Sequence, residues 1–258
     1  MKKKSDDTNM IKTKMREKAK LFGFSKTNKY DKVLKNKPKI KAIIFDMDNT
    51  LLDFFGYKIK ATKAALKAMQ KAGLKIDSKK GYGKMFSMYY IHGFESRMIF
   101  QKFLEDVKGY ADPKLIAAAM IAYREAREKA LKPYPDVKPT LRKLKKMGIK
   151  TIIVSDAFRL KAWLRLTSAG LQDEFDTVIT HNDTLDYKAS LKPFKLAVKK
   201  LKLKPEQILM VGDSQKRDIE PAKRFGFQTC IAMYGRKHAP TINVPRLKSF
   251  KDVLKFVR

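Results

Sequence analysis

Four aspartates of the sequence follow short apolar runs, where their carboxylates are placed to take part in chemistry. Asp46 and Asp48 come directly after the run KAIIF, and Asp213 and Asp218 follow the run ILMVG. If both runs are parallel strands, their carboxyl ends meet at the edge of the sheet where ligands bind in open α/β folds. Carboxylates gathered in one place repel one another unless they hold a cation or share a proton. We therefore expect a cation site there.

Two further polar side chains are expected at the same edge of the sheet. Ser155 ends the apolar run IKTIIVS, and Lys192 stands before Pro193 at the start of a helical pattern. Oxygen ligands without His or Cys suit Mg²⁺. An aspartate in such a site can attack phosphorus and form an aspartyl-phosphate. Phosphoryl transfer is the chemistry that this set of residues favours.

The apolar runs and the patterns between them predict the elements that would position these residues. Helical patterns, most of which stop at a glycine or before a proline, separate five apolar runs. Strands that alternate with helices are typical of an α/β fold, with a parallel sheet covered on both faces. The runs predicted to be strands are the one that follows Ile40 and those at residues 149–155, 175–180, 208–212 and 229–233.

One stretch, between residues 52 and 148, interrupts this alternation. It has helical periodicity at 61–72, 98–107 and 114–132, and it contains no convincing strand. A direct crossover between parallel strands needs only a dozen or so residues. We expect an inserted helical subdomain at 56–132, between core segments at 39–55 and 133–258. Within the insertion, the glycines of GYGK at 81–84 predict a mobile turn.

The composition narrows the class of protein. Its 258 residues include 59 Lys and Arg against 26 Asp and Glu, a formal net charge of +33, and 44% are hydrophobic. The single cysteine, Cys230, excludes an internal disulfide, and the three histidines are too far apart in sequence to indicate a zinc site. No apolar run approaches the roughly 18 residues that span a bilayer. We expect a cytoplasmic protein whose charge favours anionic partners.

Residues 1–38 differ from the rest of the chain because they are strongly basic and poor in apolar residues. We expect a flexible or peripheral extension. Together with the Lys-rich surface, it favours weak, non-specific binding of nucleic acid or of an anionic surface, although no nucleic-acid-binding motif is recognisable. A lysine coat adapted to heat or to an unusual cytoplasm is an equally good interpretation. The sequence leaves the oligomeric state open.

Four motifs, taken in order, resemble those of the haloacid dehalogenase (HAD) superfamily of phosphohydrolases. They are DMDNT at 46–50, Ser155 in IIVSD, Lys192 in LKP, and GDSQKRD at 212–218. The similarity covers about residues 40–250 and includes the helical insertion, which resembles the α-helical cap of that family. It implies a Rossmann-like, doubly wound parallel sheet with an inserted cap. It also implies a Mg²⁺-dependent phosphatase that acts on a small phosphorylated metabolite.

The resemblance further implies a role for each motif residue. Asp46 would be the nucleophile and a Mg²⁺ ligand. Asp48 would protonate the leaving oxygen and then activate water, while its backbone carbonyl binds Mg²⁺. Ser155 would hydrogen-bond a phosphoryl oxygen, and Lys192 would neutralise the nucleophile and the transferring group.

The same resemblance implies that Asp213 and Asp218 complete the metal site with Asp46 and the Asp48 carbonyl. Two alternatives to a metabolite phosphatase stay open. A phosphomutase would keep Asp48 and differ in how the cap handles a phosphorylated intermediate. A basic, nucleic-acid-associated protein would direct its phosphatase activity at nucleic-acid ends.

Overall fold

The structure of the chain is a computed structural model that describes residues 38–235 and 240–257. The extension predicted for residues 1–38 therefore lies outside the described residues, except for Pro38. Within the described ranges, no helix combines the length and the apolar character that a membrane span requires.

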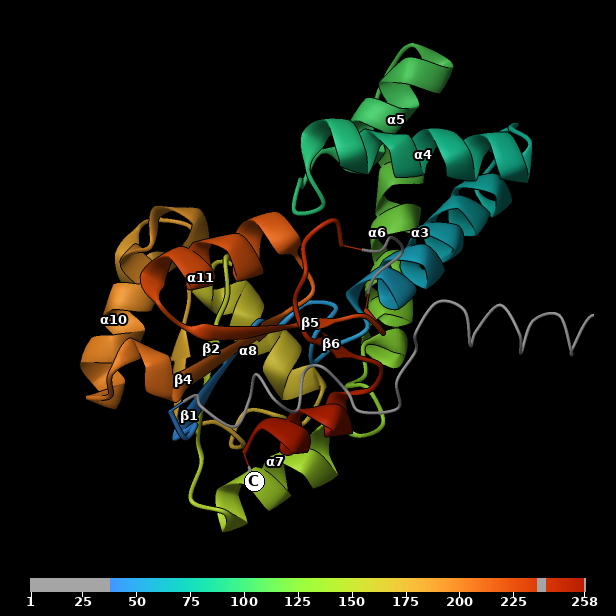
Figure 1. Cartoon of the computed structure of the whole chain (residues 1–258). Coiled ribbons are helices and arrows are strands. Elements are labelled where there is room, and N and C mark those ends of the chain that lie inside the picture. Colours follow the sequence, from blue (N-terminus) through green and yellow to red (C-terminus); the bar gives the residue numbers. More distant parts are fainter. Residues whose placement is uncertain (1–37, 236–239, 258) are drawn as a thin grey trace, which may run out of the picture. The chain divides into compact units, whose positions relative to one another are not determined.

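The described strands form one parallel sheet in the order β3-β2-β1-β4-β5-β6 (Figure 1). The first strand, β1, therefore lies inside the sheet, between β2 and β4. The five predicted strands are confirmed, while β6 has two residues and is too short to show an apolar pattern. The strands are β1 (Ala42–Phe45), β2 (Lys150–Val154), β3 (Thr177–Ile179), β4 (Ile208–Gly212), β5 (Gln228–Ala232) and β6 (Arg246–Leu247).

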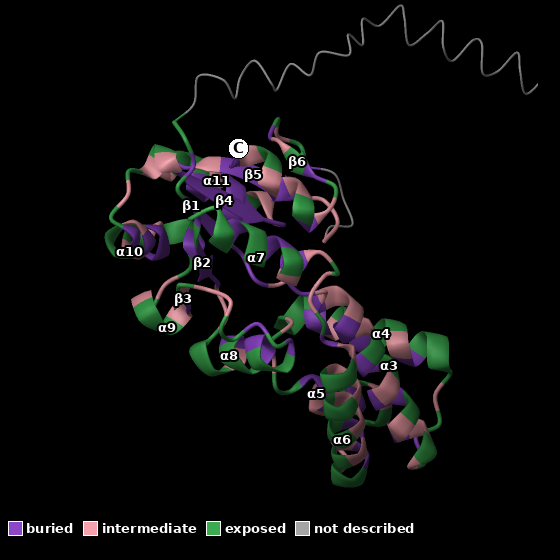
Figure 2. Ribbon diagram, turned by 90° about the horizontal axis from the view of Figure 1, so that it is seen from below, coloured by how far each residue is buried: buried purple, intermediate pink, exposed green. Residues whose placement is uncertain are grey.

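Helices cover both faces of the sheet, which makes it a doubly wound α/β fold. Ile43 and Phe45 of β1 pack with α7 (Val137–Lys146), α8 (Arg159–Ser168) and the 3₁₀ helix η4 (Phe250–Phe256). Ala42 and Ile44 face the opposite way, toward α10 (Lys192–Leu201) and α11 (Glu220–Phe225). Figure 2 shows the strands as the buried layer of this arrangement. Burial on both faces explains why the strands read as continuous apolar runs.

Several short turns complete the core after β3 and β4. They are α9 (His181–Thr184), the 3₁₀ helices η1 (Lys188–Ser190) and η2 (Pro205–Gln207), and a π-helical turn, η3 (Gln215–Ile219). Two of them matter for chemistry, because η1 carries a buried lysine and η3 carries a buried aspartate.

Between β1 and α7 the chain forms a helical insertion. Three of its four helices begin at an aspartate whose side chain accepts a hydrogen bond from a free N–H of the first turn, as N-caps do. The insertion has a hydrophobic cluster of its own, which includes Met69, Met85 and Phe103. That it serves as a separate cap subdomain stays a prediction. Its helices are α3 (Phe54–Lys71), α4 (Ser78–His92), α5 (Ile99–Lys108) and α6 (Pro113–Ala130).

The mobile turn predicted for residues 81–84 is wrong, because these residues lie inside α4. A Cβ on Gly81 would come within 3.0 Å of the Leu66 side chain on α3. Gly81 is therefore used here for the close approach of two helices, and not for chain reversal.

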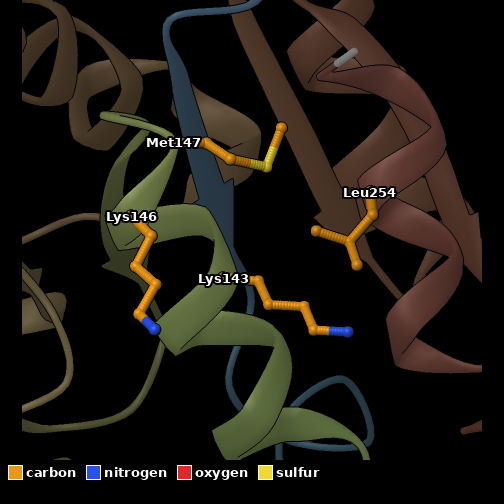
Figure 3. A pocket seen from close by; sticks show the side chains of 4 residues that line it. All are labelled: Lys143, Lys146, Met147 and Leu254. Atoms are coloured by element: carbon orange, nitrogen blue, oxygen red, sulfur yellow. The ribbon is translucent and has the colours of Figure 1, made fainter.

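A surface hollow of about 340 Å³ lies between α7 and η4 (Figure 3). Its lining residues are Lys143, Lys146, Met147 and Leu254. Met147 directly follows the last residue of α7 and comes shortly before β2 begins, so the hollow lies toward the amino ends of the strands. Ligands of open α/β sheets bind at the opposite, carboxyl ends, which is where the polar motif residues are found.

Candidate active site

The loop after β1 is held in place by several backbone contacts. The N–H of Asp46 donates to the carbonyl of Val211 at 2.9 Å, which continues the pairing with β4. Asn49 adopts a positive φ of 59°, and its side-chain oxygen accepts a hydrogen bond from the N–H of Phe55 at 3.0 Å. A Cβ on Gly235 would lie 1.6 Å from the carbonyl oxygen of Asn49, so only glycine fits there. The loop that carries Asp46 and Asp48 is thus rigidly positioned.

Three buried carboxylates converge at the carboxyl ends of β1 and β4. Asp46, Asp213 and Asp218 each offer an oxygen, and these oxygens lie within 4.8 Å of one another. The carboxylate of Asp218 occupies the space where a side chain at residue 212 would begin, since a Cβ on Gly212 would come within 2.4 Å of it. The N–H of Ser214 also donates to Asp218, at 2.8 Å. Three buried carboxylate oxygens form a donor set that fits a hard divalent cation.

Burial and mutual repulsion raise the pKa values of Asp213 and Asp218. Burial, with Asp46 and Asp218 nearby, raises the pKa of Asp213 to about 8. Burial also raises the pKa of Asp218 to about 6, although the Lys188 ammonium opposes the change. A raised pKa means that the negative charge of the carboxylate is poorly compensated by its surroundings. A bound cation would offset the repulsion between the ionised carboxylates.

The lysine that contacts this cluster is Lys188, and not the predicted Lys192. Lys188 is buried, and its ammonium lies 2.5 Å from a carboxylate oxygen of Asp46 and 2.5 Å from one of Asp218. Burial alone would lower its pKa, but the carboxylates of Asp218 and Asp46 hold the pKa above its ordinary value. The backbone N–H of Lys188 donates to Asp156 at 2.9 Å, so Asp156 helps to position it.

Lys192 is placed outside the site. Its side chain is 67% exposed and pairs with Asp186 at 3.0 Å. The reason lies in the periodicity of α10, whose buried face includes Phe194, Ala197 and Leu201. A residue two positions before Phe194 lies about 200° around the helix from it, which turns Lys192 toward solvent. Lys188 precedes the helix, in η1, and its side chain enters the site from there.

Asp48 lies beside an arginine that we did not predict. Nη1 of Arg165, on α8, donates to Oδ2 of Asp48 at 2.6 Å. Oδ1 of Asp48 is buried and has no hydrogen-bond partner among the described residues. Burial raises the pKa of Asp48 to about 6, although Arg165 opposes the change. A carboxyl group with a pKa near neutrality is suited to giving up and taking back a proton.

Ser155 lies where it was predicted, buried at the end of β2. Its N–H donates to the carbonyl of Ile179 at 2.9 Å, and its hydroxyl oxygen accepts a hydrogen bond from the N–H of Ala157 at 3.2 Å. Because β1 pairs Phe45 with Ile153, Asp46 and Ser155 follow neighbouring strands at the same edge of the sheet.

Comparison with known proteins agrees with this geometry. Residues 40–226 match the family of haloacid dehalogenase-like hydrolases. A glyceraldehyde 3-phosphate phosphatase of Methanocaldococcus jannaschii is 34% identical over 197 residues, which are 76% of this chain and 86% of that protein. The chain belongs to the haloacid dehalogenase-like hydrolases. The family match and this relative together make it a phosphatase.

Solved structures of HAD proteins share the fold. A HAD phosphatase from Thermococcus onnurineus superposes with a TM-score of 0.60 and 25% identity, covering 84% of this chain and 97% of that chain. A HAD hydrolase of Bacillus subtilis, solved with magnesium bound, gives a TM-score of 0.63 at 19% identity and covers 85% and 99% of the two chains.

In the present chain, itself a HAD hydrolase, a loop of the helical insertion contacts the core beside Asp48. This α4–α5 loop, residues 93–98, carries Glu95, which pairs with Arg165 and with Lys161 of α8. Of the groups that we did not predict, Arg165 gives a recognisable signal in the sequence. It lies on the buried face of α8 with Ala162 and Leu166, where a cation is unusual.

A buried lysine of α3 holds the same loop. Lys58 donates to the carbonyl of Phe94 at 2.6 Å. Its ammonium also lies 4.6 Å from the centre of the Tyr89 ring and 5.6 Å from that of Phe54, contacts that favour a cation. Burial nevertheless lowers the pKa of Lys58 to about 8.

This lowered pKa predicts a dependence of stability on pH. Below about pH 8 the lysine is charged in both the folded and the unfolded state, and the folded state bears the full cost of its burial. Between pH 8 and 10.5 the folded state loses the proton first, so the free energy of unfolding rises with pH. We expect the wild type to gain up to about 3 kcal/mol over this range relative to Lys58→Met. Urea unfolding of the wild type and of Lys58→Met at pH 8 and at pH 10.5 measures this gain in the free energy of unfolding.

Lys60, an exposed lysine of the same helix, provides the control. Its replacement, Lys60→Met, is expected to leave the pH dependence of the wild type unchanged. Equal pH dependence in all three proteins would contradict the burial cost assigned to Lys58.

Proposed function

We propose that this phosphatase is Mg²⁺-dependent and hydrolyses a small phosphorylated metabolite through an aspartyl-phosphate on Asp46. The observation that carries the proposal is the buried cluster of Asp46, Asp213 and Asp218, with Lys188 in contact with two of its members. The phosphatase from Methanocaldococcus jannaschii is named for glyceraldehyde 3-phosphate, which supports a substrate of about that size.

Asp46 is the group proposed to attack phosphorus. Lys188 lies against one of its carboxylate oxygens, and the Thr50 hydroxyl lies 3.5 Å from the other. These contacts fix the orientation of the carboxylate, and the ammonium offsets the negative charge that an anionic phosphoryl group meets on approach. Ser155, at the end of the neighbouring strand, supplies a hydroxyl to hydrogen-bond a phosphoryl oxygen.

Asp48 is proposed to move the proton in both steps. It protonates the leaving oxygen while Asp46 becomes phosphorylated, and it then removes a proton from the water that cleaves the aspartyl-phosphate. Its Oδ1 is the atom available for this task, because Oδ2 accepts the hydrogen bond from Arg165. The charged Arg165 stabilises the ionised form of Asp48 between the two steps.

The carboxylates of Asp46, Asp213 and Asp218 would hold Mg²⁺, together with the Asp48 carbonyl that the family resemblance implies. When bound, the ion neutralises negative charge on the phosphoryl group. Three carboxylates against two cations, the Lys188 ammonium and the nearby Arg217 guanidinium, leave an excess of negative charge in the cluster. That excess is the reason to expect a divalent cation here.

Removal of divalent cations is expected to lower phosphate release by at least about 100-fold, and Mg²⁺ should restore it better than Ca²⁺, because Ca²⁺ is larger and less strict in geometry. Asp213→Ala should raise the Mg²⁺ requirement or abolish activity. A colorimetric phosphate assay over a panel of small phosphate monoesters measures both effects. Asp173→Ala, at an exposed aspartate outside the cluster, is the control and should respond to Mg²⁺ as the wild type does.

Full activity in excess chelator would contradict the metal assignment. The same panel distinguishes the alternatives, because a phosphomutase would return phosphorylated product in place of free phosphate. An enzyme directed at nucleic-acid ends would release phosphate from 5′- or 3′-phosphorylated oligonucleotides in preference to metabolites.

A further inference from the structure

Glu95 extends from the α4–α5 loop toward the group proposed to protonate the leaving oxygen. Its side chain is 40% exposed. Lys161 donates both to the Glu95 carboxylate, at 2.5 Å, and to its backbone carbonyl, at 3.1 Å. The preceding carbonyl, of Phe94, accepts the hydrogen bond from Lys58. Glu95 is therefore fixed through its backbone and through its side chain.

A single guanidinium connects Glu95 to Asp48. Arg165 donates through Nη1 to Oδ2 of Asp48 at 2.6 Å and through Nη2 to Oε1 of Glu95. Arg165 is itself buried, and its guanidinium lies 4.9 Å from the centre of the Phe54 ring. The buried, stacked guanidinium has little freedom to move. Glu95 is therefore held close to Asp48, with only the Arg165 guanidinium between the two carboxylates. Under the proposed function, this is the side of the site on which the leaving group departs.

The cations of this corner already have partners without a substrate. Arg165 pairs with Asp48 and Glu95, and Lys161 pairs with Glu95. The third cation, Lys58, is buried and donates to the Phe94 carbonyl. Partial burial would raise the pKa of Glu95, but Arg165 and Lys161 hold that pKa below its ordinary value. Glu95 is therefore negative at neutral pH. A leaving group that carries its own negative charge would find Arg165 and Lys161 occupied and Lys58 buried, and it would meet the Glu95 carboxylate.

We infer that Glu95 is a specificity-determining residue, which excludes phosphate esters whose leaving group is anionic and favours those whose leaving group is uncharged. The inference rests on the proposed function, because that function places the leaving group beside Asp48. Like-charge juxtaposition is a general means of rejecting a competing ligand.

A purely structural role for Glu95 makes a different prediction. If the pairs with Lys161 and Arg165 only held the loop against α8, removing the charge would change activity toward all substrates by the same factor. Charge selection changes the ratio between substrates that differ in the charge of the leaving group. The ratio is therefore the quantity to measure.

Glycerol 3-phosphate and 3-phosphoglycerate are suitable probes, because they share a three-carbon frame and differ by a hydroxymethyl group in place of a carboxylate. We expect the wild type to prefer glycerol 3-phosphate. In Glu95→Gln, which frees Arg165 and Lys161 to meet an anion, the ratio of the two kcat/KM values should shift toward 3-phosphoglycerate by about tenfold, or about 1.4 kcal/mol. Adding Arg165→Gln to Glu95→Gln should remove the gain.

Glu125, an exposed glutamate of α6, supplies the control variant, Glu125→Gln, which should keep the wild-type ratio. A ratio within about twofold of the wild type in Glu95→Gln, or an equal loss on both substrates, would overturn the inference and leave Glu95 a structural role.

A binding measurement separates this inference from the proposed function. Isothermal titration calorimetry of both probes with Asp46→Asn, with and without Glu95→Gln, reports the same ratio without turnover. If the wild type released no phosphate from any ester but the binding ratio shifted, the proposed function would fail while the selection by charge stood. If phosphate were released but neither ratio shifted, the inference alone would fail.

Discussion

Asp46→Asn is expected to fold normally and to lose phosphate release by at least about 10³-fold, because an amide of the same shape cannot attack phosphorus. The substitution removes one of three buried carboxylates that repel one another, so the free energy of unfolding should not fall. Steady-state phosphate release and urea unfolding of the same preparation measure the two parts of this expectation.

The covalent step has a signature of its own. Brief reaction of the wild type with a phosphate ester, followed by acid quenching, should trap a phosphorylated protein whose modified peptide contains Asp46, and Asp46→Asn should trap none. A folded Asp46→Asn protein that turned over substrate at the wild-type rate would exclude the aspartyl-phosphate mechanism.

Lys188→Met is expected to lower kcat/KM by about 10²–10³-fold, because the ammonium that contacts Asp46 is lost. Asp46 and Asp218 then lose their buried cationic partner, so this variant should also be less stable, by about 3 kcal/mol in the absence of metal. Circular dichroism and urea unfolding establish the temperature at which the folded variant is assayed.

Two variants control for this loss of stability. Lys188→Arg keeps the positive charge but replaces a compact ammonium with a planar fork, so it should fold and remain slow. Lys192→Met alters an exposed lysine four residues away in the sequence and should stay within about twofold of the wild type. An inactive Lys192→Met protein beside an active Lys188→Met protein would restore Lys192 to the site.

The sheet could be predicted from the sequence because each strand is buried on both faces. Such strands read as short continuous apolar runs, and the glycine or proline after most intervening helices marks where the helix ends. The register of β1 with β4 then brings Asp46 and Asp213 to one edge. Helix α4 escaped prediction because Gly81 is used for close packing against α3, and packing between segments that are apart in sequence leaves no local signal.

The lysine of the site was misplaced for a related reason. Lys188 precedes α10 and Lys192 is its first residue, and the sequence Lys192-Pro193 looks like a helix start in its own right. The positive φ of Leu191, 70°, turns the chain between η1 and α10, and that turn decides which lysine enters the site. Glu95 could not be predicted, because its role depends on contact with a helix that lies far along the chain.

The sheet order also has a consequence for how this protein is made. β1 pairs with β2 and β4. Of the two residues that pair with Ala42, Lys150 of β2 is the nearer in sequence. During synthesis, the strand that ends at the nucleophile leaves the ribosome long before either neighbour exists, whereas α3 and α6 can pack against each other first. Contacts between segments close in sequence form faster than distant strand pairings. The helical insertion is therefore in a position to fold before the sheet, and Asp46 enters its final surroundings only when β4 arrives.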